Sequence, residues 1–199
     1  MNESKPRKYH PQKTRKAIID AGLSLLDLHG YHGTSVDKIA KDAGITKGAF
    51  YHHFKSKEEL LALIHQEYAE YQLKAMEEVL DRNLSSEDQL RALVVSIVEA
   101  VGLYKPNVTV FFHERRYLTE KYLKQTTKQR DRLEKAFRRV IEEGMRSGEF
   151  RQDLDSKVTC LGIIGMCAWM YQWFSPDGRL SASDVADTFS SLLIDGLVA

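Results

Sequence analysis

Two short helices joined by a tight turn are predicted for residues 35–54, and this stretch constrains the fold more than any other part of the chain. Its sequence is SVDKIAKDAGITKGAFYHHF. Ile39 and Ala43 belong to an apolar series at helical spacing, so one side of the first helix must pack against the rest of the protein. Gly44 supplies the left-handed residue that closes this helix. Thr46 follows with a side-chain oxygen that caps the next helix.

The second helix of this stretch has a packed side and a polar side. Ala49, Phe50 and Phe54 supply the apolar contacts. The other side presents small, basic or hydrogen-bonding residues, which are Lys47, Gly48, Tyr51 and His52. A short helix with a polar outer face, placed after another helix and a tight turn, is typical of a helix-turn-helix DNA-binding motif. Helix pairs with a glycine in the turn also occur in ordinary helical proteins, so turn chemistry alone leaves both interpretations open.

Charge is divided unevenly along the chain. Residues 1–57 hold 11 Lys and Arg against 5 Asp and Glu, although the net charge of the whole chain is +1. A basic head on an acidic body is expected when only one end of a protein meets phosphate, and an incidental split of solvated charge is the alternative. Residues 1–12 are expected to be a basic arm or a disordered tail. Lys57 opens a predicted helix, where a cation opposes the helix dipole, so a nearby phosphate is one reason for its presence.

The run GYHGTSVDKIAKDAGITKGAFYHHFKSKEELL resembles the N-terminal signature of the TetR family of transcriptional regulators. The segments GTSV, IAKDAGITKGAFYHHF and FKSKEEL fall in the family's order and spacing, within a similarity that covers residues 13–71. We therefore expect a DNA-binding domain over residues 12–72 and a ligand-binding and dimerisation domain over residues 73–199. The resemblance implies phosphate or backbone contacts at Thr34 and Lys57. The expected DNA-binding residues are Thr34, Ser35, Thr46, Lys47, Gly48, Tyr51, His52 and Lys57.

The remaining segments predict helices, so the fold class is all-α with nine helices, as in the TetR family. An apolar stripe over Lys13–His29 predicts the helix that braces the motif. Ser56 and Glu59 form a predicted capping box at the start of a long helix that links head and body. Residues 107–117 alternate as a strand does, but we expect a helix there because no partner strand is predicted elsewhere. Further helices are expected over residues 85–103, 119–146, 155–174 and 182–198.

The last two predicted helices indicate a homodimer. Residues 158–174 are apolar nearly all round, so this helix must be buried on several sides. Two chains that each contribute Asp155–Phe174 and Ala182–Val198 would form a four-helix interface, in which Gly162 and Gly165 permit close approach. A central helix in a monomeric bundle is the alternative. The family resemblance favours the dimer, which would address two half-sites of a pseudo-palindromic operator in double-stranded DNA.

Aromatic and thioether side chains gather in the predicted body, as they do in apolar ligand pockets, although such residues are also ordinary core residues. Arg115 and Arg116 point about 100° apart on a helix, so one of them can face the interior. A buried guanidinium needs an anion, which is either a neighbouring glutamate or the carboxylate or phosphate of a ligand. The expected ligand-binding residues are Tyr104, Phe111, Phe112, Arg115, Arg116, Met166, Trp169, Met170 and Trp173.

The C-terminal segments HERRYL, FRQDLD, WMYQWFSPDGRLS and LLIDGL resemble the TetR subgroup that responds to acyl-coenzyme A thioesters and controls fatty-acid or related catabolism. The resemblance implies a repressor that a small apolar or acyl-CoA effector releases from its operator. The alternative is a DNA-binding dimer that has no small-molecule effector and acts through a protein partner.

The sequence predicts neither an enzyme nor a bound cofactor or metal. His52 and His53 are adjacent rather than four residues apart, so they do not present two imidazoles on one helix face as a metal site requires. His65 and His113 are single histidines on packed helices, where a surface or hydrogen-bonded role is expected. There is also no Gly-rich phosphate loop and no nucleophile elbow.

Cysteine usage and hydropathy bear on the expected compartment. Cys160 and Cys167 lie on one predicted helix, roughly 10 Å apart by the helical rise, so they cannot form a disulfide with each other. We expect both to be small core residues, which fits a reducing compartment. The first residues are polar and basic, and no apolar run approaches the length of about 18 residues that a membrane span needs. We therefore expect a cytoplasmic protein that does not associate with membranes.

Overall fold

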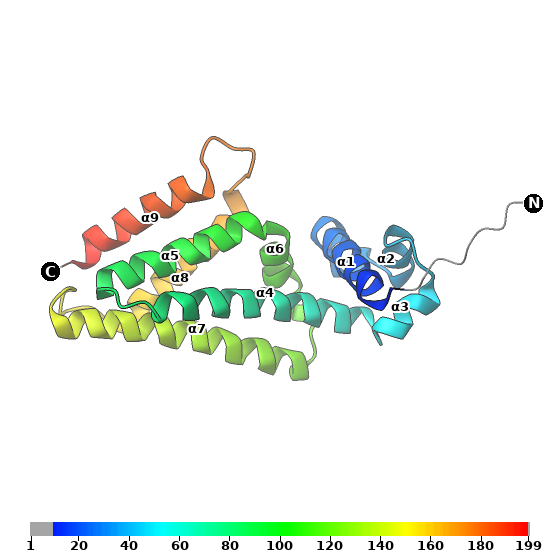
Figure 1. The fold of residues 1–199 in the computed structure, drawn as a ribbon, viewed down its shortest axis with the longest axis horizontal. Coiled ribbons are helices and arrows are strands. Elements are labelled where there is room, and N and C mark those ends of the chain that lie inside the picture. Colours follow the sequence, from blue (N-terminus) through cyan, green and yellow to red (C-terminus); the bar gives the residue numbers. More distant parts are fainter. Residues whose placement is uncertain (1–9, 199) are drawn as a thin grey trace, which may run out of the picture.

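The computed structural model describes residues 10–198 and contains nine α-helices and one 3₁₀ turn, with no strand in that range. Residues 1–9 of the predicted basic arm lie outside the described residues. A small head at one end consists of α1 to α3, a longer body consists of α5 to α9, and α4 extends from one to the other (Figure 1). The predicted all-α fold of nine helices is confirmed.

The helix bounds agree with the sequence-based expectations to within a few residues. In order, the elements are α1 Pro11–Gly33, α2 Val36–Asp42, α3 Lys47–His53, α4 Lys57–Leu80, α5 Ser86–Leu103, α6 Lys105–Glu114, η1 Arg115–Tyr117, α7 Glu120–Ser147, α8 Ser156–Trp173 and α9 Ala182–Leu197. No single described helix is long and apolar enough to span a membrane. Only α5 taken together with the α6–η1 segment, across a bend of 92°, reaches the necessary length and hydropathy.

The helix-turn-helix forms because short-range signals, among them the predicted Gly44 and Thr46, act on its backbone. Ser35 Oγ accepts the Lys38 N–H at 3.2 Å and so caps α2. Gly44 adopts a φ of 67°, which closes α2 with the left-handed residue that glycine permits. Thr46 Oγ1 accepts the Ala49 N–H at 3.1 Å and caps α3. Both helices of the motif are therefore fixed at their N-termini by their own side chains.

Two further helices begin at side-chain caps, of which the one at Ser56 is predicted from the sequence. Ser56 Oγ accepts the Glu59 N–H at 3.1 Å at the start of α4. The Glu59 carboxylate accepts the Lys55 N–H instead of the Ser56 N–H, so the predicted capping box is only half formed. At α9 the box between Ser181 and Asp184 is complete.

The strand-like segment after residue 106 is helical, as we expected. It forms α6 and then the 3₁₀ turn η1, and both Val108 and Val110 are buried. Val110 packs in the core of the head, whereas Val108 packs in the core of the body. This short segment therefore joins the two halves of the protein, in addition to α4.

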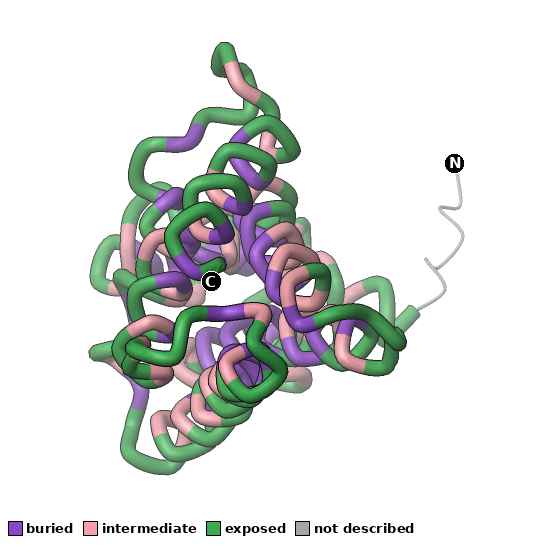
Figure 2. The backbone as a smooth tube through the Cα atoms, turned by 90° about the vertical axis from the view of Figure 1, so that its left-hand side faces the viewer, coloured by how far each residue is buried: buried purple, intermediate pink, exposed green. Residues whose placement is uncertain are grey.

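Two hydrophobic cores meet along α4. Leu60, Leu61 and Ile64 near its start belong to the core of the head. Leu73 and Met76 near its end belong to the core of the body. Buried positions gather where the helices face one another and exposed positions lie on their outer sides (Figure 2). Since one continuous helix contributes to both cores, the head cannot move without transmitting force to the body. Cys160 and Cys167 are free thiols buried in the body core, as predicted.

Candidate DNA-binding surface and effector cavity

The outer face of α3 presents the residues that we expect to contact DNA. Lys47, Gly48, Tyr51 and His52 are exposed, and they share one side of the helix because residues four apart in sequence are neighbours on a helix surface. Half of the Tyr51 side chain is exposed, and its ring packs edge to face against the buried ring of Phe50 at 5.5 Å. This packing orients the phenol outward. The nearest atom to a Cβ placed at Gly48 would be Thr46 Oγ1, at 3.8 Å, so no neighbouring side chain covers the helix surface at this residue.

Lys47 already has an anionic partner in the head. Its Nζ lies 2.9 Å from Asp37 Oδ2 on α2, and both side chains are more than half exposed. The hydrogen bond and the charge of Asp37 raise the pKa of Lys47. An exposed pair of this kind contributes little stability, so a DNA phosphate can replace the carboxylate at small cost.

The structure argues against a direct DNA contact by Thr34. Its side chain is buried, and Thr34 Oγ1 donates a hydrogen bond to the Leu25 carbonyl at 2.9 Å. The hydroxyl therefore ties the end of α1 back onto its own preceding turns. Ser35, the next residue, is exposed and stays in position for such a contact.

Lys57 has a structural partner that the sequence does not reveal. Its Nζ donates hydrogen bonds to the carbonyls of Tyr31 and Thr34 and lies 3.8 Å from the centre of the Tyr31 ring. A cation is unfavourable in the first turn of its own helix α4, but it is favourable beside the carbonyls that end α1. The expected phosphate is thus not needed to explain this lysine. Burial lowers the pKa of Lys57, and the negative charge of Glu114 opposes that shift.

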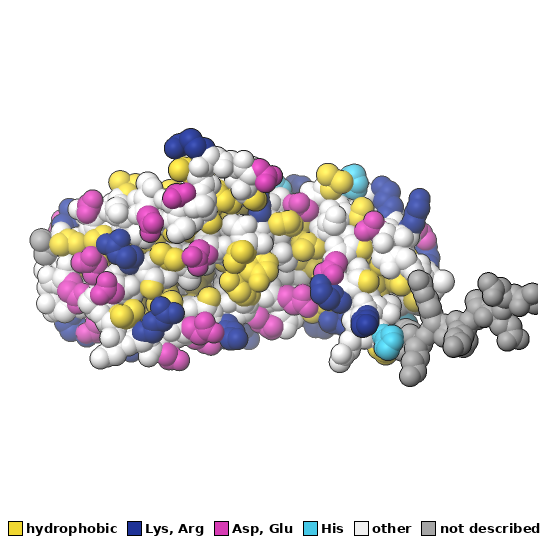
Figure 3. Space-filling view, turned by 45° about the horizontal axis from the view of Figure 1, so that its top comes forward, with side chains coloured by type: hydrophobic (Ala, Val, Ile, Leu, Met, Phe, Trp, Pro, Cys, Tyr) yellow, Lys and Arg dark blue, Asp and Glu magenta, His cyan; other side chains and the backbone are white. Residues whose placement is uncertain are grey.

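A view of one face of the molecule illustrates the distribution of charge. Lys and Arg side chains occur on the head beside a few Asp and Glu side chains, and both signs of charge are interspersed on the body (Figure 3). Among the described residues of the head, Lys38, Lys41 and Lys55 are exposed together with Lys47. This arrangement suits a surface that approaches a phosphate backbone.

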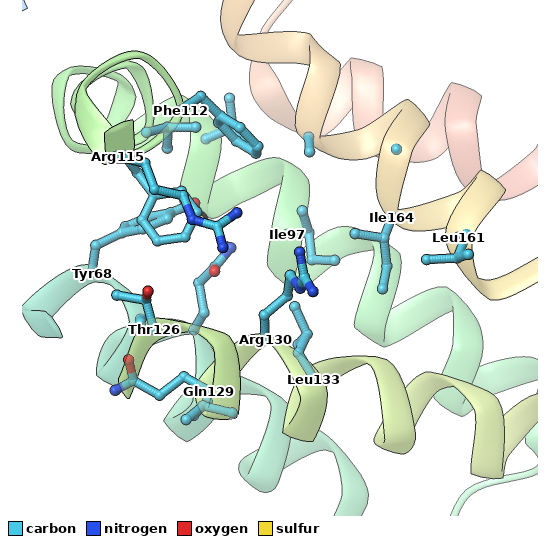
Figure 4. A pocket seen from close by; sticks show the side chains of 18 residues that line it. Tyr68, Ile97, Phe112, Arg115, Thr126, Gln129, Arg130, Leu133, Leu161 and Ile164 are labelled. Carbon is cyan, nitrogen blue, oxygen red and sulfur yellow. Dashed lines mark hydrogen bonds between the residues drawn. The ribbon is translucent and has the colours of Figure 1, made fainter. Parts of the chain in front are cut away.

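A cavity of about 360 Å³ lies in the body among α4, α5, α6, η1, α7 and α8. Its walls are mostly apolar, with Ile97, Leu133 and Ile164 among the lining residues. The guanidinium groups of Arg115, from η1, and Arg130, from α7, extend into the same space (Figure 4). Cavities of this size and composition bind small organic molecules.

The polar groups of the cavity gather near Arg115. Gln72 Nε2 donates to Tyr68 Oη at 2.9 Å, and Thr126 lies on the facing helix α7. Arg115 is half-buried and forms no ion pair with any described carboxylate. Arg130 has only a long contact of 3.8 Å to Asp131, and both of those side chains are about half exposed. The cavity thus combines an apolar chamber with two guanidinium groups that lack a close anion.

Only three of the nine residues expected to bind ligand line this cavity, which are Phe111, Phe112 and Arg115. Arg116 lies outside it, with its guanidinium carbon 5.1 Å from the centre of the Tyr117 ring. Tyr104 packs against Tyr71 at 4.6 Å. The other four, which are Met166, Trp169, Met170 and Trp173, do not line this cavity either, and Met170 is a core residue, the alternative that the sequence left open.

The reason for this error is the orientation of α8. Met170 faces the body core and is fully buried, whereas Trp169 is 62% exposed and Trp173 is 49% exposed. The α8 residues that do reach the cavity include Ile164 and Ala168. Because the helix is apolar on nearly every side, its sequence does not reveal which side faces which neighbour.

Sequence reasoning missed the polar residues of α4 and α7 in the cavity wall. Gln72, Thr126, Gln129 and Arg130 lie on helices whose sequences are dominated by charged or apolar stripes. The side-chain oxygen of Gln129 is buried and has no hydrogen-bond partner among the described residues. Gln129 was the available signal for a cavity, because it is a polar residue among the inward positions of α7 and a buried amide requires a hydrogen-bond partner.

An exposed apolar surface covers α8 and the adjoining side of α9. It includes Val158, Leu161, Trp169, Trp173 and Leu192, each of them about half exposed or more. A Cβ placed at Gly162 or Gly165 of α8 would meet nothing within 4 Å. Extended apolar patches of this kind mark protein contact surfaces.

Comparison with known families assigns both halves of the chain. Residues 18–64 match the family described as "Bacterial regulatory proteins, tetR family". Residues 83–197 match the family described as "Tetracyclin repressor-like, C-terminal domain". The first match includes the helix-turn-helix, and the second includes most of the cavity wall and the exposed apolar surface.

Individual proteins are similar over nearly the whole chain. The HTH-type transcriptional repressor KstR2 of Mycolicibacterium smegmatis is 26% identical over 188 residues, covering 94% of this chain and 92% of KstR2. The structure of the ketosteroid transcriptional regulator KstR2 of Mycobacterium tuberculosis superposes with a TM-score of 0.87 at 23% identity, over 93% of this chain and 95% of that one, which supports the fold. AibR in complex with isovaleryl coenzyme A and operator DNA superposes with a TM-score of 0.83 at 27% identity, over 91% of this chain and 98% of AibR.

Proposed function

The chain belongs to the TetR family of helix-turn-helix transcriptional repressors, which bind operator DNA as dimers, and we propose that a small molecule regulates it. The small molecule would bind in the body cavity and release the protein from its operator. The observation that carries this proposal is the apolar cavity with the guanidinium of Arg115, which has no ion-pair partner among the described residues. A half-buried arginine without a carboxylate partner can bind an anion, and a ligand can supply one. The proposed effector is therefore an apolar molecule with a carboxylate, phosphate or thioester-linked nucleotide end.

An acyl-coenzyme A thioester is the effector class that we favour. AibR, a structural neighbour, has been crystallised with isovaleryl coenzyme A. A volume of about 360 Å³ is at the lower end of the range for ligand pockets, so the acyl group would occupy the chamber and the nucleotide would extend outside it. Arg130, which is exposed and lines the cavity, lies where it would meet a phosphate of that nucleotide.

On the DNA side, we propose that α3 enters the major groove. Thr46, Lys47 and Gly48 would lie at the entrance of the groove, and Tyr51 and His52 would contact phosphates or base edges. Ser35 would flank them. Lys57 would act through the end of α1, whose carbonyls it binds, rather than through a phosphate of its own.

The homodimer would form through α8 and α9. The exposed apolar surface supports this, because Trp169 and Leu192 would otherwise stay in water, at a cost of about 2 kcal/mol for each large side chain left unburied. The exposed backbone at Gly162 and Gly165 leaves room for a second α8 to approach. Two heads would then address two half-sites of a pseudo-palindrome.

The test combines a thermal shift with operator binding. We expect isovaleryl-CoA or a longer acyl-CoA to stabilise the protein by about 2.7 kcal/mol at about 100 times its dissociation constant, and coenzyme A alone to stabilise it less. The same compound should lower operator affinity, because an effector must favour the state that does not bind DNA.

Two adjacent arginines supply a matched control for that test. Arg115→Ala removes a guanidinium from the cavity, whereas Arg116→Ala removes one that lies outside it over the Tyr117 ring. We expect only Arg115→Ala to weaken ligand binding. Equal loss in both variants, or no response of the parent protein to any acyl-CoA, would favour the alternative of a dimer that acts through a protein partner.

A further inference from the structure

Glu114 links the wall of the cavity to the helix-turn-helix. It is the last residue of α6, and Arg115, the next residue, lines the cavity. Its own side chain points the other way: the residue is 7% exposed, and Glu114 Oε2 accepts the backbone N–H of Tyr31 at 3.0 Å. Two consecutive residues thus face the cavity and the head respectively.

The Tyr31 N–H is available for this bond because α1 is interrupted at Gly30. This glycine has φ 66° and ψ 177°, which is outside the helical region. Its ψ turns the following N–H away from the helix axis, so the donor needs a partner outside α1. A Cβ at residue 30 would lie 3.3 Å from Glu114 Oε1, so the positive φ and the close approach both favour glycine.

Two charges on the unfavourable ends of their own helices meet at this junction. Glu114 is at the C-terminal end of α6, and Lys57 is at the N-terminal end of α4. Each opposes its own helix dipole, so each must be stabilised by something else. They surround the same segment, residues 31–34: Glu114 accepts from its first N–H, and Lys57 donates to the carbonyls of its first and last residues.

Aromatic packing holds the same segment against the body. The rings of Tyr31 and Tyr117 stack at 4.8 Å with an interplanar angle of 12°, and His32 meets Tyr117 edge to face at 4.7 Å. Residues 31–34 lead directly into Ser35, the cap of α2. Residues 31–34 therefore contribute to the direction in which the helix-turn-helix leaves the body, together with α4 and the packing of Val110 in the head core.

We propose that Glu114 is the positioning residue of the DNA-binding head: its carboxylate holds the Tyr31 N–H and so fixes the orientation of α2 and α3 relative to the body. A ligand that binds Arg115 in the cavity shifts the backbone to which Glu114 belongs and loosens this hold. That regulatory consequence rests on the proposed function, whereas the positioning role does not.

The test measures the distance between head and body directly. Spin labels are attached at Lys41→Cys on α2 and Lys124→Cys on α7, both exposed positions. Labelled chains are diluted with unlabelled protein so that each dimer contains one labelled chain. The native thiols of Cys160 and Cys167 are buried, and burial raises their pKa values to about 11 and about 12, so they react slowly with the label.

We expect a narrow distance distribution in the parent, a broad one in Glu114→Ala and a narrow one in Glu114→Gln, whose amide oxygen still accepts the N–H. Operator affinity, measured on a site selected from random duplexes, should fall at least tenfold in Glu114→Ala and less than threefold in Glu114→Gln. The control is Glu149→Ala, because Glu149 accepts the Glu87 N–H at 3.1 Å within the body and does not touch the head. It should leave both readouts unchanged.

If Glu114→Ala does not fold, Glu114→Asp replaces it in the experiment. Aspartate keeps the negative charge, but its side chain is one methylene shorter, so its carboxylate lies farther from the Tyr31 N–H. A broad distribution in that variant supports the proposal. A narrow distribution in a folded Glu114→Ala or Glu114→Asp protein, or equal broadening in Glu149→Ala, overturns it. If no acyl-CoA changes operator binding while Glu114→Ala loosens the head, the proposed effector function fails and the positioning role stands.

Discussion

Acid should destabilise this protein through His65, a buried histidine of α4. Its side chain is fully buried, and its ring lies 5.0 Å from that of Phe111 on α6. Neither ring nitrogen has a well-formed hydrogen bond among the described residues. Burial lowers the pKa of His65 to about 4; a poorly aligned hydrogen bond with the Val110 backbone opposes this shift, and the positive charge of Arg115 adds to it. The expected surface role for this residue is therefore wrong.

The sign and size of the effect follow from the pKa difference. In the unfolded chain His65 has the ordinary histidine pKa of 6.5. Below that pH the unfolded state is therefore protonated at His65, whereas the native state stays neutral there until the pH approaches about 4. The free energy of unfolding is therefore highest above the unfolded pKa and falls as the pH decreases toward about 4. A difference of roughly 2.5 pKa units corresponds to about 3 kcal/mol in total, and about 2 kcal/mol of it is lost by about pH 5.

Urea unfolding of the parent and of His65→Leu, between about pH 7 and about pH 5, measures this contribution. Leucine fills a similar volume and has no polar atoms to leave unsatisfied, so we expect it to match or exceed the parent at neutral pH. The stability difference should grow by about 2 kcal/mol in favour of His65→Leu as the pH falls. His113→Leu is the control, because His113 is an exposed histidine on α6. A difference between His65→Leu and parent that stays constant with pH would refute the reasoning.

Three further predictions concern the head and the dimer. Tyr51→Ala should weaken operator binding by about 1 kcal/mol or more without changing the oligomeric state, as gel-shift titration and gel filtration would measure; unchanged affinity would mean that α3 is oriented differently on DNA. Lys57→Ala should lower the free energy of unfolding by about 1–2 kcal/mol, because two carbonyls lose a cationic donor. It should leave the salt dependence of DNA binding unchanged, and a slope reduced by about one would instead support a direct phosphate contact. Trp169→Glu should convert the dimer to a monomer in sedimentation velocity, since it places a charge in the exposed apolar surface; a persistent dimer would place the interface elsewhere.

The contacts around residues 31–34 also suggest why the head needs two attachments to the body. The continuous helix α4 is one attachment, because its side chains pack in both cores. The carboxylate of Glu114 and the ring of Tyr117 contact the head at a second point, away from α4. Glu58 adds a third contact, since its Oε1 accepts the Thr119 N–H at 2.8 Å between the start of α4 and the start of α7. These polar contacts lie beside the apolar packing of Val110 in the core of the head.

The sequence by itself determined the helices and the polar outer face of the helix-turn-helix. Ser35, Gly44 and Thr46 act on backbone groups within a few residues of themselves. Such short-range signals can be recognised in the sequence without knowledge of the fold. The match of motif order and spacing likewise identified the family. What these features share is that each depends on short separations along the chain.

Tertiary structure alone decided which side chains meet across the molecule. Lys57 donates to carbonyls at the end of α1, and the buried Thr34 hydroxyl donates to the Leu25 carbonyl. Arg115 rather than Arg116 faces the cavity. Trp169 looks like a pocket residue in sequence, yet it lies on the outer surface of α8. The physical reason is that hydrophobic periodicity gives the apolar side of a helix but not the neighbour to which that side is applied. The rotation of each helix is fixed by packing against partners that are distant in sequence, and the cavity exists only once six of those segments have packed.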